Sequence, residues 1–167
     1  MPRISTPVGG PTPDEILVHV RRCLVNPGWA VTMVGGSERA ATVEPPYAYT
    51  TGLWQTFQHP ELMLIGLEGQ MAYTLLNNAG RLIANGQRLR AGTVLAEPLI
   101  ANVAFSVRAV ALPERGTVGS PLATRLLHPE GAVPHFQLVW PNRHGAYPPA
   151  AGARWPHQPL LPALTAH

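Results

Sequence analysis

The first clear pattern of polar and apolar positions along the chain is helical and lies between residues 12 and 25. Thr12 is a favourable N-cap, Pro13 suits the first helical position, and the acids at positions 14 and 15 complement the helix dipole. The apolar positions that follow recur at helical spacing: Ile16, Leu17, Val20, Cys23 and Leu24. Because the sequence Asn-Pro-Gly at residues 26–28 stops a helix, the pattern predicts one amphipathic helix.

Strand-like patterns follow this breaker. Residues 29–34 alternate between apolar and polar positions, residues 35–44 read as a hairpin connection with a polar tip, and residues 47–53 supply the partner strand. Residues 61–67, with the sequence ELMLIGL, are almost continuously apolar over the length of a strand. Such a run is typical of a central strand that is buried on both faces.

The second half of the chain adds a second main helix at residues 70–85, where a buried stripe recurs at helical spacing. Strands are predicted at residues 92–97, 102–112 and 136–140, and a helical turn or third helix is predicted at residues 121–127. Strands and helices do not alternate regularly, so the pattern argues against a doubly wound sheet.

The predicted fold is α+β, with a curved or barrel-like, mostly antiparallel sheet and two main helices. Residues 1–11 are rich in Pro and Gly and predict a flexible N-terminal arm, and residues 12–140 form a single α+β domain. Residues 141–167 contain six prolines, a density that excludes regular structure. We expect this segment to pack on the domain as an extended C-terminal strap.

Composition narrows the possible chemistry. The chain has 12 basic residues, all of them Arg, so lysine Schiff bases, a pyridoxal phosphate anchor and a Walker-type phosphate loop are excluded. The only Asp is Asp14 at the predicted helix start, which leaves Glu for any carboxylate chemistry. The single Cys23 offers no disulfide framework and reads as a small hydrophobe on the buried helix face.

Charge and hydrophobicity also bear on partners. The net charge is +3, but the Arg residues are scattered rather than gathered in a stripe, so no nucleic-acid partner is predicted. Only 13% of residues are charged, which favours covering apolar surface in a homodimer. No leader and no membrane-spanning run is visible, so we expect a cytoplasmic protein with no membrane partner.

Several motifs in a fixed order resemble a bacterial family described as domain of unknown function 4262. They are YAYTTGLW, HPELMLIGL, LLNNAGRLIANG, QLVWPNRHGAYP and a closing QPLL, and the resemblance covers roughly residues 15–161. It implies a small soluble domain and no established activity. The family's late motif carries an acid where this chain has Asn142, and a Trp after the late Pro where residues 147–149 read Tyr-Pro-Pro. A role of that acid would be lost or altered here.

The candidate catalytic residues are His59, Glu61 and His144. A neutral His accepts a proton near pH 7, and a carboxylate two residues away on a strand shares its face and can orient it. The alternative is structural: Pro60 makes a turn, His59 caps it, and Glu61 pairs with an Arg.

The candidate substrate-binding residues are Tyr49, Trp54, Asn142 and Arg143. Aromatic side chains with polar ends line many ligand pockets, and an Arg guanidinium binds a carboxylate or phosphate in a fork. The alternatives are a core role for the aromatic residues and an ion pair between Arg143 and Glu61 or Glu68 that pins the tail.

No cofactor and no metal are predicted from spacing, because the seven His form none of the usual ligand patterns. Convergence in space remains open for a dispersed set: His59, Glu61, His144 and His157.

Two functions follow from these residues. The first is a small cofactor-independent enzyme that acts on an anionic or polar metabolite by acid/base chemistry, as an isomerase, cyclase, lyase or hydrolase. The second is a non-catalytic module that binds a small molecule or a protein. A flavin-binding barrel is a weaker alternative, since no phosphate donors can be identified.

Overall fold

A computed structural model of the chain describes residues 10–35, 37–39, 42–67, 69–95, 107–111, 121–129, 131, 133–141, 144, 146 and 147. The predicted N-terminal arm and the predicted C-terminal strap lie almost entirely outside these residues, so both stay predictions.

The first helix, α1 (Pro13–Val25), begins where the sequence predicts it. Thr12 and Glu15 form a capping box, in which the backbone N–H of Thr12 donates to the Glu15 carboxylate at 2.7 Å and the N–H of Glu15 donates to the Thr12 hydroxyl at 3.3 Å. These bonds satisfy N–H groups that a helix start otherwise leaves without partners.

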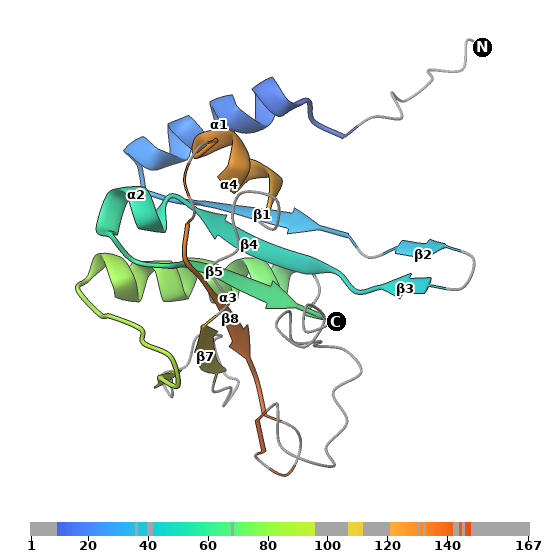
Figure 1. Cartoon of the computed structure of the whole chain (residues 1–167), viewed down its shortest axis with the longest axis vertical. Helices are drawn as coiled ribbons and strands as arrows, with labels where there is room; N and C mark the ends of the chain where they lie inside the picture. Colours follow the sequence, from blue (N-terminus) through green and yellow to red (C-terminus); the bar gives the residue numbers. More distant parts are fainter. Residues whose placement is uncertain are drawn as a thin grey trace.

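A six-stranded sheet forms the centre of the molecule (Figure 1). Its strands, in spatial order, are β1 (Ala30–Val34), β4 (Tyr47–Thr51), β5 (Glu61–Ile65), β8 (His135–Val139), β7 (Val107–Ala111) and β6 (Val94–Leu95). Every neighbouring pair is antiparallel except β5 and β8, which are parallel. The predicted mostly antiparallel sheet is therefore confirmed, and β5 is the buried central strand that its apolar run indicates.

The sheet is open in the part of the chain that the structure describes. Strands β1 and β6 stand at its two ends, and no described pairing joins them, so the barrel-like form is not confirmed. The predicted hairpin connection at residues 35–44 contains a small antiparallel sheet of its own, formed by β2 (Ser37–Arg39) and β3 (Thr42–Glu44). It extends the hairpin of β1 and β4 beyond the body of the domain (Figure 1).

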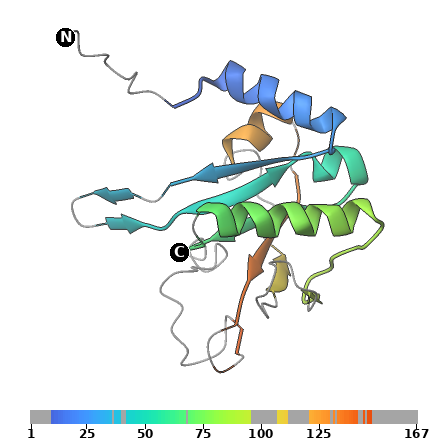
Figure 2. The same cartoon turned by 180° about the vertical axis from the view of Figure 1, so that it is seen from behind.

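Helices cover both faces of the sheet. The long helix α3 (Gly69–Ala84) packs on one face (Figure 2), and α1 packs with α4 (Leu122–Leu127) on the other. Each face has its own core. Leu62, Leu64, Leu75 and Leu76 belong to the α3 side, and Tyr49, Met63 and Val20 belong to the α1 side. Fully burying a Leu side chain contributes about 2 kcal/mol, so the α3 face supplies much of the stability.

A short helix, α2 (Leu53–Phe57), replaces the end of the strand predicted at residues 47–53. The chain leaves β4 at Gly52, whose φ of 122° favours glycine. A Cβ on Gly52 would lie 2.8 Å from the carbonyl oxygen of Gly28, so the close approach of the two backbones also requires glycine. Within the described residues, no helix is long and apolar enough to cross a membrane.

Candidate functional site

His59 lies between α2 and β5 with only 1% of its surface exposed. Its Nδ1 is 2.7 Å from the carbonyl oxygen of Pro60, and its Nε2 accepts the backbone N–H of Leu89 at 3.0 Å. Because Nε2 accepts a hydrogen bond, the proton resides on Nδ1 and is donated to Pro60. Burial lowers the pKa of His59, which favours this neutral form. Both ring nitrogens are thus engaged within the protein.

The Glu61 side chain is fully buried at the start of β5. One carboxylate oxygen accepts the Thr50 hydroxyl at 2.6 Å, and the other accepts the backbone N–H groups of Gly52 at 2.7 Å and Trp54 at 3.1 Å. The Thr50 hydroxyl in turn accepts the N–H of Leu62 at 2.9 Å. Burial raises the pKa of Glu61, and these hydrogen bonds oppose the rise. The carboxylate, at the start of the next strand, caps the start of α2.

His59 and Glu61 are both brought into the interior, but their hydrogen bonds serve different segments. His59 ties the start of β5 to the loop after α3, whereas Glu61 ties β5 to the end of β4 and to α2. The two side chains have no hydrogen-bond partner in common among the contacts above. Their arrangement secures the turn between residues 50 and 61.

Of the other predicted site residues, those that the structure describes lie on different elements. Tyr49 is buried on the α1 side of the sheet, where its hydroxyl accepts the N–H of Ala123 at 3.2 Å, and burial raises its pKa. Trp54 is half-buried on α2, and His144 is exposed after β8. Asn142 and Arg143 lie outside the described residues, so their predicted role in substrate binding stays a prediction, as does the alternative ion pair of Arg143 with Glu61 or Glu68.

Within the described residues, no group of three or more His, Cys, Asp or Glu side chains could hold a metal ion. The dispersed set whose convergence the sequence leaves open includes His157, which is not described. Two other histidines are notable. His128 and His135 each have a buried Nε2 with no hydrogen-bond partner among the described residues, and the Nδ1 of His135 lies 2.7 Å from the carbonyl oxygen of Val133. Burial lowers the pKa of both side chains.

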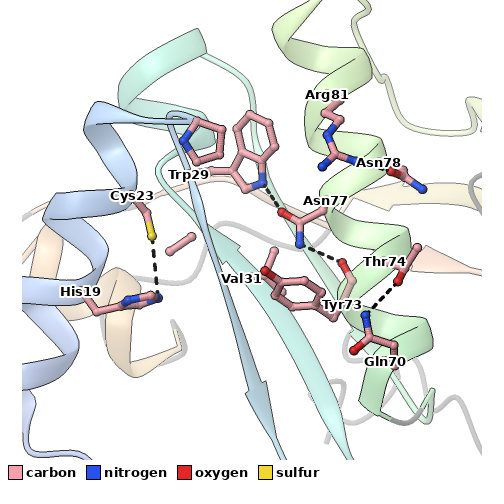
Figure 3. Close-up of a pocket in the computed structure, with 12 residues that line it drawn as sticks. His19, Cys23, Trp29, Val31, Gln70, Tyr73, Thr74, Asn77, Asn78 and Arg81 are labelled. Carbon is pink, nitrogen blue, oxygen red and sulfur yellow. Dashed lines mark hydrogen bonds between the residues drawn. The ribbon is translucent and has the colours of Figure 1, made fainter.

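A groove of about 400 Å³ lies beside the start of β1 (Figure 3). Residues 29–31, at the start of β1, form its floor, with α1 as one wall and α3 as the other. From α1 come His19 and Cys23. The α3 wall consists of Gln70, Tyr73, Thr74, Asn77, Asn78 and Arg81. Most of these side chains carry hydrogen-bonding groups, and no acidic residue is among the described ones that line the groove.

Hydrogen bonds fix the walls of this groove. The indole N–H of Trp29 donates to the Oδ1 of Asn77 at 3.1 Å, and the Nδ2 of Asn77 donates to the carbonyl oxygen of Tyr73 at 3.0 Å. A guanidinium nitrogen of Arg81 donates to Asn78 at 2.7 Å. On the opposite wall, the Cys23 thiol lies 3.7 Å from the Nε2 of His19, and burial raises the pKa of the thiol.

None of the groove residues was a candidate in the sequence. A signal for them does exist, because the polar residues of α3 recur at helical spacing beside its buried stripe: Gln70, Tyr73, Thr74, Asn77, Asn78 and Arg81. This stripe predicts a second face on α3, but not what lies opposite that face.

Comparison with known proteins gives one family. Residues 24–154, more than half of the chain, match the profile of a family with the description "Domain of unknown function (DUF4262)". None of the curated proteins gives a significant match. Among solved structures, a SUFU (suppressor of fused protein) homolog from Neisseria gonorrhoeae FA 1090 is similar with a TM-score of 0.40 and 13% identity over 77% of this chain and 76% of that one. A likeness at this level supports no inference for the present chain.

Proposed function

The chain belongs to the DUF4262 family, and we propose that it is a non-catalytic binding module whose polar ligand lies in the groove between α1, β1 and α3. The groove itself carries this proposal. It gathers hydrogen-bonding side chains from two helices beside a sheet edge, in a space of about 400 Å³. Ligand sites commonly have this size and combine an apolar floor with a few placed polar groups.

The charge of the groove favours an anionic or neutral ligand. Arg81 contributes a guanidinium, and the lining includes His19 but no acid within the described residues. An Arg side chain has more donors than the one bond to Asn78 uses, so it can also bind a carboxylate. We therefore expect a ligand that offers hydrogen-bond acceptors and a carboxylate to this wall.

Acid/base catalysis by His59 and Glu61 is the second candidate, and the contacts give it less support. A general base needs a free nitrogen within reach of its substrate. Both ring nitrogens of His59 face protein groups, and the Glu61 oxygens accept three described donors. Catalysis would require these internal bonds to break first. The flavin-binding alternative gains no additional support from the groove.

The test is a thermal-shift and calorimetric titration with a panel of dicarboxylates, amino acids and short peptides. We expect ligands that carry a carboxylate to stabilise the protein and to bind less well to Gln70→Ala and Arg81→Ala. Arg90→Ala removes an exposed guanidinium that does not line the groove, and it is the matched control. A ligand whose binding is weakened by His59→Gln, but not by Gln70→Ala or Arg81→Ala, would contradict the proposal.

A further inference from the structure

The outer edge of β1 has no partner among the described residues. On its inner side β1 pairs with β4 over its whole length, from Ala30 opposite Thr51 to Val34 opposite Tyr47. In such a pair, alternate residues of β1 direct their N–H and C=O groups away from β4. These backbone groups form a row of donors and acceptors along the open edge of β1. The groove lies beside the first two residues of that edge, Ala30 and Val31.

The sequence of β1 does not protect this edge. Natural edge strands are usually guarded by Lys, Pro, bulges or other charges, because an open edge pairs with any extended chain. Residues 30–34 read AVTMV and contain no charge, no Pro and no Gly. Met33 on this strand is 51% exposed. The strand therefore has the composition of one that receives a neighbour.

The shape of the groove favours a single extended segment. The groove is lined from both faces of the sheet edge, by His19 and Cys23 of α1 and by the polar stripe of α3 (Figure 3). A second copy of the chain would bring its own α1 and α3 beside its β1, and these helices would meet the walls. A lone peptide strand carries no such helices and needs only the strand spacing of about 4.8 Å beside β1.

The walls suit the backbone and charge of such a segment. The Gln70 amide carries both donors and an acceptor, and its Nε2 also donates to the Thr74 hydroxyl at 3.3 Å, so its Oε1 can accept a peptide N–H. Arg81 suits a carboxylate on the same segment. Exposed apolar side chains stand near this edge, with Met33 on β1 and Tyr73, 42% exposed, on α3.

We propose that the ligand of this groove is an extended polypeptide segment of another protein, carrying a carboxylate, that adds as a new edge strand to β1. This inference rests on the proposed function and makes it specific. Backbone hydrogen bonds to β1 would supply affinity, and the walls would select alternate side chains, as in other cases of strand addition.

The test begins with a display library of linear peptides in which β-branched residues alternate with randomised positions that include Glu and Asp. The strongest binder is then synthesised as it stands and with alternate backbone amides N-methylated on one edge or the other. We expect N-methylation of one edge to weaken binding about thirtyfold or more, because it removes two or more backbone hydrogen bonds to β1. We also expect the unmodified peptide to slow amide exchange in β1.

Two protein variants give independent evidence. In neighbouring residues of β1, one N–H faces β4 and the next faces the open edge, so of Val31→Pro and Thr32→Pro one should fold normally and lose the peptide. If neither variant folds, the N-methylated peptides still show whether backbone pairing with β1 contributes to binding. Equal binding of all peptide forms, protection elsewhere than β1, or a β1-paired dimer without peptide would each overturn strand addition. A peptide whose binding requires Arg81 but is unaffected by N-methylation on either edge would contradict strand addition and would still support ligand binding in the groove. If neither Gln70→Ala nor Arg81→Ala weakened the binding of any ligand or peptide, both proposals would be wrong.

Discussion

The indole N–H of Trp29 donates to the Oδ1 of Asn77 at 3.1 Å and so joins the residue before β1 to the middle of α3. Trp29 is 2% exposed, and its ring packs against Phe57 of α2 with 6.1 Å between the ring centres. Asn77 is held in turn by its bond to the carbonyl oxygen of Tyr73. The floor and the α3 wall of the groove are thus fixed to each other before any ligand binds.

We expect this hydrogen bond to be measurable in a double-mutant cycle. Trp29→Phe and Asn77→Ala should each lower the free energy of unfolding, and the pair should show a coupling of about 1 kcal/mol, because either change removes the same bond. Urea unfolding of the four proteins supplies the values. Strictly additive effects would show that the bond contributes nothing to stability.

Gly80 of α3 should not tolerate alanine. A Cβ there would lie 2.5 to 2.8 Å from three atoms of the Trp29 ring, so the ring must move. We expect Gly80→Ala to destabilise the protein by about 1–3 kcal/mol from overpacking, partly offset by a helix-propensity gain of up to about 1 kcal/mol. Gly35→Ala is the matched control, since nothing lies within 4 Å of its Cβ position. Equal effects in the two variants would refute the role of the Trp29 contact.

Removing the Glu61 carboxylate should loosen the turn between β4 and β5. Glu61→Ala leaves Thr50, Gly52 and Trp54 without their acceptor in a buried site, and we expect a loss of about 3 kcal/mol. Glu61→Gln retains the shape and one acceptor, so we expect a loss of about 1 kcal/mol. Chemical unfolding at neutral pH distinguishes them, and an alanine variant as stable as the parent would contradict the capping role.

The pH dependence of Glu61 has a defined sign. Burial raises its pKa above the ordinary 4.5, so between 4.5 and the folded-state pKa the folded protein binds more protons than the unfolded chain. Its contribution to stability therefore falls as the pH rises through that window. The difference in stability between parent and Glu61→Gln should show this trend, and a difference that does not change with pH would count against it.

His59 should have the opposite effect on acidification. Burial lowers its pKa below the ordinary 6.5, so the unfolded chain binds protons that the folded protein excludes. Its stabilising contribution is complete above about pH 6.5 and is lost as the pH falls through the folded-state pKa. His135 shifts in the same direction and adds to the effect. Between neutral and mildly acidic pH, the free energy of unfolding should therefore decrease less in His59→Gln than in the parent. An equal decrease in the two proteins would contradict this assignment.

Much of the fold could be predicted because its signals are local. The capping box of Thr12 and Glu15 sets the start of α1, and the continuous apolar run identifies β5 as the central strand. The short helix α2 could not be predicted, since its N-terminal N–H groups are capped by Glu61, which follows the helix and belongs to another element. A strand pattern in residues 47–53 gives no sign of that contact.

The candidate site was predictable only in part. Residue chemistry identified His59 and Glu61, but their hydrogen-bond partners, Leu89 and Thr50 among them, depend on how distant segments pack. The groove depends on even longer-range facts, because it exists where the edge strand β1 lies between helices from two faces. The sequence contains the polar stripe of α3, but it does not show that β1 is the edge strand beside that stripe.

The most direct test of the groove as the functional site is a two-dimensional NMR titration of the labelled protein with the strongest library-selected peptide. We predict that the indole N–H resonance of Trp29, the side-chain amide of Asn77 and the backbone amides of β1 shift together as the peptide saturates. Shifts that concentrate instead at Gly52 and Leu89, with the Trp29 indole unchanged, would place binding near Glu61 and His59 and contradict the account.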